Sequence, residues 1–184
     1  MANTSKACRV VTGRHTVFAF LNVVNPKPQL YGNGKPIYSA QLIIPKSDTR
    51  TMDKIRDAIV QAMTEGQYKL QQGLEGPVKA AELKLPVHDG DIERPGVPEY
   101  KDAWFINANN RRDKPSIVDK DLNHIYDSKE LYSGIIGRAS IQFYAFNSGG
   151  SRGIACSLGN IQKLEDGPIL ASHPTAEDDF AEED

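Results

Sequence analysis

Aromatic and cationic side chains alternate with apolar ones in residues 134–147, which read GIIGRASIQFYAFN. The odd positions up to 145 hold apolar residues or glycine, which predicts one buried face of a β-strand. The even positions carry Arg138, Tyr144 and Phe146 among polar residues. Bases of a single-stranded nucleic acid stack on exposed rings while cations meet its phosphates. The pattern therefore favours a nucleic-acid surface; the alternative is that both rings pack beneath a long loop over residues 74–100.

A second group of rings and cations occupies residues 100–114, YKDAWFINANNRRDK. Trp104 and Phe105 are adjacent, so on a strand they point to opposite faces and one of them should be buried. The end of this segment holds the densest basic cluster of the chain, for which an ordinary solvated turn is the alternative. The candidate residues for contacts with nucleic acid are Arg111, Arg112, Lys114, Arg138, Tyr144, Phe146, Tyr100, Lys101, Trp104, Tyr31 and Lys35.

Three carboxylates lie close together in residues 88–93, HDGDIE. Asp89, Asp91 and Glu93 could hold the metal ion of a nuclease, but their spacing matches neither an EF-hand nor a nuclease motif. A loop turn built on Asp-Gly is the preferred interpretation. The chain has no GxxxxGK[ST], GxGxxG or GxSxG motif. We therefore expect no enzymatic activity, no metal and no cofactor.

The net charge of −2 is an average over two unlike parts. Residues 177–184 carry six acidic residues and no basic one; without them, 18 acidic residues face 22 basic ones, a net charge of +4. An acid-rich segment with one ring could compete with nucleic acid for a basic groove and bind partner proteins. The alternative is a solubilising terminus. The residues of this predicted tail are Glu177, Asp178, Asp179, Phe180, Glu182, Glu183 and Asp184.

These candidate residues need strands to position them, and β-branched and aromatic runs predict five. Alternation in the first strand would place Val17, Ala19, Leu21 and Val23 on one face. A helix should begin at Ser47 or Asp48, present Met52, Ile55, Ile59, Val60 and Met63 as an apolar stripe, and end at Gly66 or Gly73. The predicted strands are 7–25 (one long strand, or a strand bent near Gly13), 37–44, 102–108, 134–147 and 152–164.

Five strands and one long helix predict a mainly β protein. The OB fold, a five-stranded barrel, fits if it carries a helical insertion and long loops. A β-sandwich is the rival, because a helix after the second strand does not match the simplest OB order. The segment from Gly167 is rich in Pro and acidic residues, so residues 167–184 should form a disordered acidic tail.

Composition also suggests where the protein acts. Cys8 and Cys156 both fall in strand-like apolar patterns, so we expect packed, reduced thiols. The N-terminus lacks the apolar run of a signal peptide. No stretch approaches the roughly 20 apolar residues of a membrane span. We therefore expect a soluble, cytoplasmic protein without a membrane partner.

Several segments, in this order and spacing, resemble a known family. They are LPVHDGD (85–91), WFINANN (104–110), KPSIVD (114–119), LYSG (131–134), RASIQFYAFN (138–147), RGIACSLGNIQKLEDG (152–167) and AEDDF (176–180). The run is similar to the phage single-stranded DNA-binding proteins of a group first described as a domain of unknown function. The resemblance is densest over residues 85–180.

This resemblance implies an OB fold over residues 1–166 that binds single-stranded DNA without marked sequence preference. It implies a role in phage DNA replication and recombination in the host cytoplasm, with neither enzymatic activity nor metal. We further expect self-association along DNA and contacts between the tail and replication proteins. The alternative is a phage structural or scaffolding protein that does not bind nucleic acid.

Overall fold

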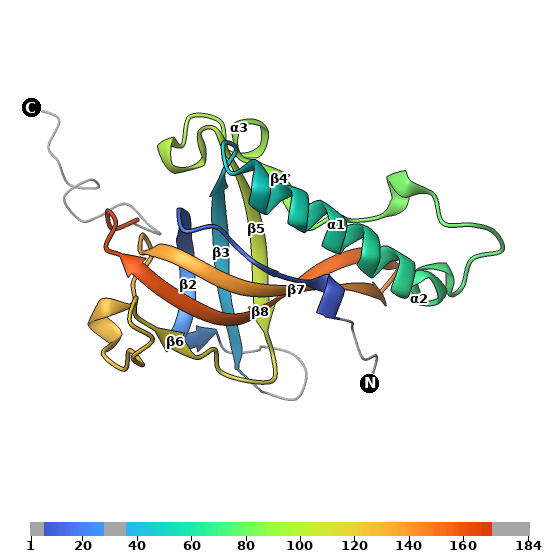
Figure 1. Cartoon of the computed structure of the whole chain (residues 1–184). Helices are drawn as coiled ribbons and strands as arrows, with labels where there is room; N and C mark the ends of the chain where they lie inside the picture. The colour runs from blue at the N-terminus through green and yellow to red at the C-terminus, as the bar shows by residue number, and fades with distance from the viewer. Residues whose placement is uncertain (1–5, 28–35, 171–184) are drawn as a thin grey trace, which may run out of the picture.

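The computed structural model describes residues 6–27 and 36–170 of the chain (Figure 1). Its strands are β1 (Arg9–Val11), β2 (Thr16–Lys27), β3 (Ile37–Pro45), β4 (Val87–Asp89), β5 (Ala103–Asn110), β6 (Ile117–Val118), β7 (Ile136–Ser148) and β8 (Ser151–Glu165). Its helices are α1 (Thr49–Glu65), α2 (Gln67–Gln71) and α3 (Gly90–Glu93). Four short 3₁₀ turns are η1 (Lys6–Cys8), η2 (Ala80–Glu82), η3 (Pro98–Tyr100) and η4 (Ser128–Glu130).

Five strands close into a barrel. The order along the sheet is β1-β7-β2-β3-β5-β8-β6, and an additional pairing of β7 with β8 completes the ring β7-β2-β3-β5-β8. Only the pairing of β5 with β8 is parallel within this ring. Figure 1 shows β2, β3 and β5 side by side, with β7 and β8 crossing in front of them. The closed ring confirms the OB barrel and removes the β-sandwich alternative.

The first predicted strand is two strands, and its alternation is broken. The chain turns between β1 and β2 around Gly13, where a bend was predicted. Within β2, Phe20 has a φ of +47° and the register with β3 shifts between Ala19 and Asn22. This β-bulge changes the phase of the strand, so Phe18 fills the core before it and Val23 after it. The predicted common face of Val17 through Val23 is therefore wrong.

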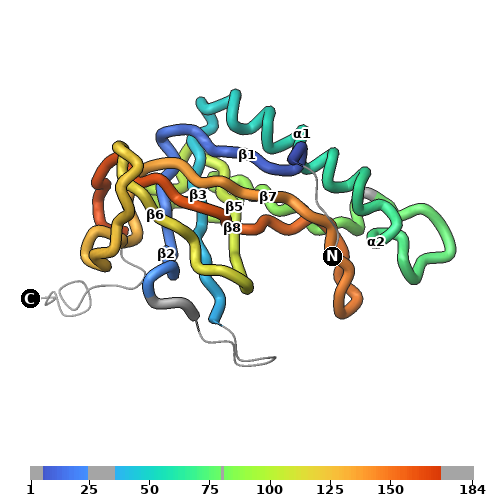
Figure 2. The backbone as a smooth tube through the Cα atoms, turned by 60° about the horizontal axis from the view of Figure 1, so that its bottom comes forward, coloured from blue at the N-terminus to red at the C-terminus, as the bar shows by residue number. Residues whose placement is uncertain are grey.

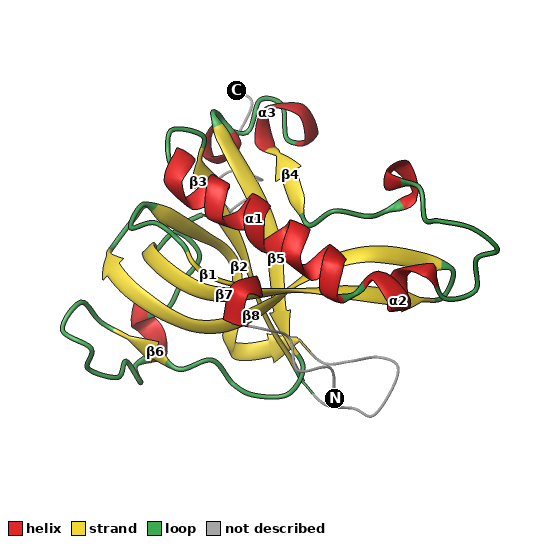
Figure 3. Cartoon of the chain, turned by 45° about the vertical axis from the view of Figure 1, so that its right-hand side comes forward, coloured by secondary structure: helices red, strands yellow, loops and turns green. Residues whose placement is uncertain are grey.

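Helix α1 and the short α2 cover the β7 side of the barrel (Figure 3). Asp48 caps α1 by accepting the Thr51 N–H at 3.1 Å. Met52 and Ile55 are buried as predicted, whereas Val60 is 61% exposed. The buried face of the second half of the helix is formed by Ala58 and Ala62 instead. Gly66 ends α1 where a Cβ would overlap the side chain of Ala145. The predicted stripe and its end at Gly66 are confirmed, except for Val60.

The β7–β8 hairpin is the longest feature of the sheet, with strands of 13 and 15 residues. Its orange end projects beyond the barrel in Figure 2. Gly149 and Gly150 form the turn with φ of +57° and +79°, a conformation that a tight hairpin requires. At this end, Arg152 donates to Leu70 O at 2.8 Å and Asn147 to Lys69 O at 3.0 Å. These bonds satisfy carbonyl groups at the end of α2.

The core runs through the barrel and under α1. Cys8 and Cys156 are both buried in it, as predicted, and burial raises the pKa of the Cys156 thiol. Among the described residues, no helix has the length and apolar character that crossing a membrane requires. Residues 167–170, assigned to the tail by sequence, contact the body: the Tyr132 hydroxyl donates to Gly167 O at 2.9 Å and Leu170 N to Ser133 O at 2.8 Å.

Candidate nucleic-acid interface

Outward-facing side chains of four neighbouring strands form a surface that we call the outer wall. Ser39 of β3 lies opposite Asn109 of β5, Asn109 lies opposite Ser157 of β8, and Ser157 lies opposite Gln142 of β7. Paired residues place their side chains on the same face, so this polar row crosses all four strands. The outer wall consists of Ser39, Gln41, Asn107, Asn109, Gln142, Tyr144, Phe146, Ala155 and Ser157, none of them acidic.

Tyr144 and Phe146 are the rings of the outer wall. Every inward residue of β7 from Gly137 to Ala145 is buried, whereas these two are partly exposed, as the alternation predicted. Ala155 lies opposite Tyr144 and Gly153 opposite Phe146, so both rings have little cross-strand cover. Residues two apart on a strand are separated by about 6.7 Å, close to twice the 3.4 Å rise per base of DNA. A base can therefore stack on either ring.

Among the described residues, the backbone of the 74–100 segment pairs with the β7–β8 hairpin at one residue, Lys84. Lys84 N donates to Arg152 O at 3.0 Å, and Ile154 N donates to Lys84 O at 2.9 Å. The segment thus extends the edge of β8 beside Gly153.

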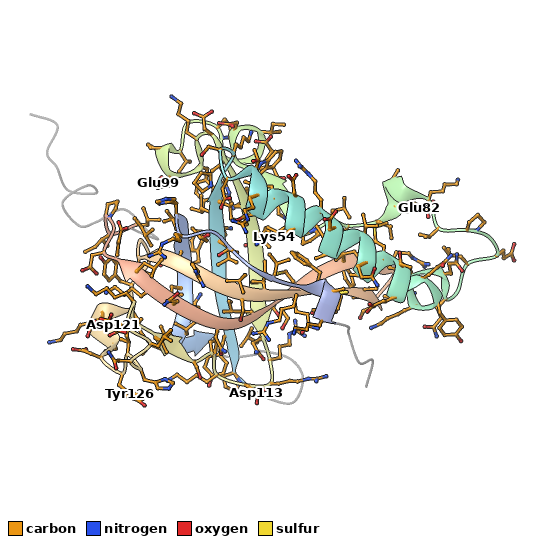
Figure 4. The ribbon with its side chains drawn as sticks, viewed as in Figure 1. Lys54, Glu82, Glu99, Asp113, Asp121 and Tyr126 are labelled. Atoms are coloured by element: carbon orange, nitrogen blue, oxygen red, sulfur yellow. The ribbon has the colours of Figure 1, made fainter. Side chains whose placement is uncertain are left out.

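The basic turn, which we define as Arg111 to Lys114, connects β5 to β6 beside β8. All its cationic side chains are on exposed residues. Asn110 holds the turn: its Nδ2 donates to Leu158 O at 2.9 Å, and its Oδ1 accepts the Arg112 N–H at 2.9 Å. Asp113, within the turn, marks its position at the lower edge of Figure 4. The predicted basic cluster is therefore fixed at the border of the outer wall.

Arg138 faces outward at the opposite end of β7, paired with Gln162. It is six positions from Tyr144, a distance of about 20 Å along the strand. Its Nε is buried and has no hydrogen-bond partner in the described part of the chain. A buried donor without a partner costs about 1–3 kcal/mol in the folded protein.

Tyr100 does not present its ring to solvent. It is 6% exposed, meets Phe105 edge-on at 5.3 Å, and donates its hydroxyl hydrogen to Gln41 Oε1. Burial raises the pKa of the phenol. Gln41 in turn donates to Asn107 Oδ1 at 2.8 Å. Tyr100, predicted to stack on a base, instead fixes two amides of the outer wall.

Trp104 and Phe105 point to opposite faces, and both are covered. Phe105 is 3% exposed, and Trp104 packs partly buried against the main core. Lys46 Nζ lies 4.7 Å from the centre of the Trp104 ring. The same Nζ donates to Asp89 and Asp91, each at 2.7 Å.

Hydrogen bonds occupy the carboxylates considered for a metal site. The hydrogen bond from Lys46 holds the pKa of Asp91 below its ordinary value. Asp89 also accepts the Asp91 N–H at 3.0 Å, which is the predicted Asp-Gly loop turn at the start of α3. Glu93 lies 2.9 Å from the Nδ1 of His88. No cluster of three metal-ligating side chains occurs within residues 6–27 and 36–170.

Arg94 and His88 were not among the residues that the sequence predicted to contact nucleic acid. His88 stacks on Phe105 with ring centres 4.9 Å apart, and the Arg94 guanidinium lies 5.9 Å from the same ring. Arg94 and the exposed Lys101 both line a hollow of about 340 Å³. The segment that carries His88 and Arg94 has no periodic pattern of apolar residues. Only the presence of cationic residues and of an imidazole ring could have indicated these positions from the sequence. The remaining candidates, Tyr31, Lys35 and the acidic residues 177–184 with Phe180, lie outside the described residues.

Comparison with known proteins gives a consistent set of relatives. The family model described as the ssDNA-binding protein of Enterobacter phage Enc34 matches residues 8–184. A putative protein p50 of Acyrthosiphon pisum secondary endosymbiont phage 1 is 26% identical over 152 residues, covering 81% of this chain and 79% of the relative.

Solved structures share the fold. The single-stranded DNA-binding protein from bacteriophage Enc34, in complex with ssDNA, is similar with a TM-score of 0.68 at 19% identity, covering 90% of this chain and 91% of that one. The single-stranded DNA-binding protein gp2.5 of bacteriophage T7 is similar with a TM-score of 0.60 at 14% identity, covering 95% of each chain.

Proposed function

Because the chain belongs to the family of the single-stranded DNA-binding protein of Enterobacter phage Enc34, we propose that it binds and coats single-stranded DNA. The binding is independent of sequence and serves phage DNA replication and recombination in the host cytoplasm. Copies of the protein associate along the DNA. The protein acts by binding and not by catalysis.

The outer wall is the observation that carries this proposal. It places two partly exposed rings on one side of Gln142 and both the basic turn and Arg138 on the other, and none of the wall's side chains is acidic. Stacking on rings tolerates every base, and cations bind the phosphates of any sequence. The wall's own polar groups are amides and hydroxyls, and two of the amides, Gln41 and Asn107, are already hydrogen-bonded to each other. Such a surface contacts the DNA backbone and the faces of the bases, so it binds without preference for a particular sequence.

The proposed contacts divide by chemistry. Phosphates meet the basic turn, Arg138 and Lys101, and bases stack on Tyr144 and Phe146. Trp104 contributes indirectly by packing against Lys46, whose backbone N–H donates to Asp102 O in the loop of Lys101. Tyr31 and Lys35 belong to the chain segment between β2 and β3, and the equivalent loop of OB folds borders the oligonucleotide.

The acidic residues 177–184 are proposed to compete with DNA for the same surface and to recruit replication proteins. Leu170, the last described residue, packs against Ala19, Ile43 and Phe105 on the outside of the barrel. This contact supports the proposal because it holds the last described residue on the same outer face of the barrel as Gln41 and Asn107, seven positions before the acidic segment begins. Competition between carboxylates and phosphates for the same cations weakens in salt.

A titration of the full chain with fluorescently labelled poly-dT tests the proposal. Affinity should fall steeply as salt rises, with a slope of about −0.7 in log–log form for each phosphate contact. A duplex of equal length is the control and should bind more weakly. Failure to bind poly-dT at low salt, or equal affinity for the duplex, would contradict the proposed function.

A further inference from the structure

A second hollow lies beside the basic turn, apart from the outer wall. Its volume is about 330 Å³. Strand β6 forms one side, and the chain then turns back so that Ile125 N donates to Ile117 O at 2.9 Å. Asp119 fixes that turn by accepting the Asn123 N–H at 2.9 Å. The hollow is lined by Val24, Lys114, Pro115, Ser116, Ile117, His124, Ile125, Tyr126 and Leu131.

The lining combines an apolar floor with an exposed ring and a cation. Ile117 and Leu131, at 5% and 9% exposed, close the floor. Tyr126 is 87% exposed, and its ring lies 5.9 Å from that of His124 at an angle of 29°. Figure 4 shows Tyr126 at the lower edge of the molecule, pointing away from the barrel. A ring this exposed adds almost nothing to the core, and unlike the exposed ring of Tyr68 it lines a hollow that also holds a cation.

We propose that this hollow binds one nucleobase of the DNA strand that the outer wall holds. The base stacks on Tyr126 over the apolar floor, and its phosphate meets Lys114. Lys114 belongs both to the hollow and to the basic turn, so a strand leaving the turn arrives here directly. Ligand pockets begin at about 300 Å³, which suits a single nucleotide.

The charge of the residues in and beside the hollow also favours a nucleotide as its ligand. No acidic residue is among the described residues that line it, and Arg111 and Arg112 lie close to Lys114 in the chain. Apolar side chains dominate the walls, so the hollow takes any base. The inference rests on the proposed function, because it assigns a further subsite to the same bound strand.

Affinity measurements on Tyr126→Ala test this subsite. Oligo-dT long enough to reach the hollow should bind about tenfold more weakly than to the wild type, the effect of losing one stacked base. A short oligo-dT that the outer wall holds alone should bind unchanged. Tyr126→Phe keeps the ring and should keep the affinity. The matched control is Tyr68→Ala, which removes an equally exposed ring (85%) from α2, and Figure 1 shows α2 at the opposite end of the molecule from β6.

Photo-cross-linking gives an independent readout. Oligo-dT containing 5-iodouracil should cross-link to the tryptic peptide of residues 121–129, which carries both His124 and Tyr126. If the wild type binds DNA but Tyr126→Ala matches Tyr68→Ala and this peptide stays unmodified, the subsite is rejected and the proposed function stands. If the wild type does not bind single-stranded DNA, both are rejected.

Discussion

Tyr144 and Phe146 differ from the other rings of the barrel in their surroundings. Phe18, Phe105 and Phe143 are all buried to 3% exposure or less. The two rings of β7 are partly exposed opposite alanine and glycine, and none of the ring–ring contacts found among the described residues involves them. An apolar ring left partly in water on a strand forgoes part of the free energy that its burial would supply. Base stacking would recover that free energy.

The combined substitution of both rings by alanine tests this directly. Each lost stack should cost about 1–3 kcal/mol, or roughly fivefold to 150-fold in affinity for poly-dT. Surface substitutions elsewhere usually change stability by less than about 0.5 kcal/mol, so thermal unfolding should move little for Tyr144→Ala. Fluorescence titration beside Tyr68→Ala provides the comparison. An unchanged affinity for DNA in the double variant would remove both rings from the interface.

Elements with strict periodicity could be predicted from the sequence, and elements set by distant contacts could not. The buried and exposed faces of β7 follow from alternation alone, because the two register shifts of its pairing with β8 place the extra residues on β8. The bulge at Phe20 reverses the phase of β2 without any Gly or Pro to signal it. The burial of Tyr100 depends on Gln41, 59 residues away in the chain. Alternation identified the rings that could stack, but packing decided which of them stay exposed.

Lys46, directly after β3, binds the loop from α3 to β5. This contact predicts that the stability of the folded protein falls at low pH. Hydrogen bonds from Lys46 and from the Asp102 N–H lower the pKa of Asp91 in the folded protein. The unfolded chain therefore takes up a proton at this site first as pH falls, so the stabilisation present near neutral pH is lost in acid. Urea unfolding between about pH 6 and pH 2 should show a shallower decline for Asp91→Asn than for the wild type.

The exposed carboxylate of Asp57 on α1 provides the control for this measurement. Asp57→Asn should follow the wild-type curve. Parallel curves for the wild type and Asp91→Asn would show that the contact between Lys46 and Asp91 does not contribute to stability.

At the scale of the whole molecule, charge is divided between regions. The strands of the barrel ring carry a single acidic residue among those described, Glu165 at the end of β8. Residues 177–184 carry six, and the rest of the chain has a net charge of +4. The net charge of −2 is thus the sum of a cationic body and an acidic end, and we propose that this end competes with DNA for the surface of the body.

Deletion of residues 177–184 should tighten binding to poly-dT and change the salt dependence, because a competing anion has been removed. Replacing the six acidic residues by their amides, with Phe180 retained, separates charge from length. Titration at two salt concentrations measures both effects. Equal affinity of the full and shortened chains at low salt would reject competition by this segment.

Ultraviolet cross-linking of the full-length protein to poly-dT tests the outer wall as the DNA-binding surface most directly. Trypsin cuts after Arg138 and Arg152, so one peptide, residues 139–152, carries both Tyr144 and Phe146. Another, residues 57–69, carries the exposed Tyr68 of α2 and reports contacts with the opposite side. We expect cross-links in peptide 139–152 that disappear at high salt, and none in peptide 57–69. Cross-links in peptide 57–69 with none in 139–152 would contradict the assignment of the outer wall.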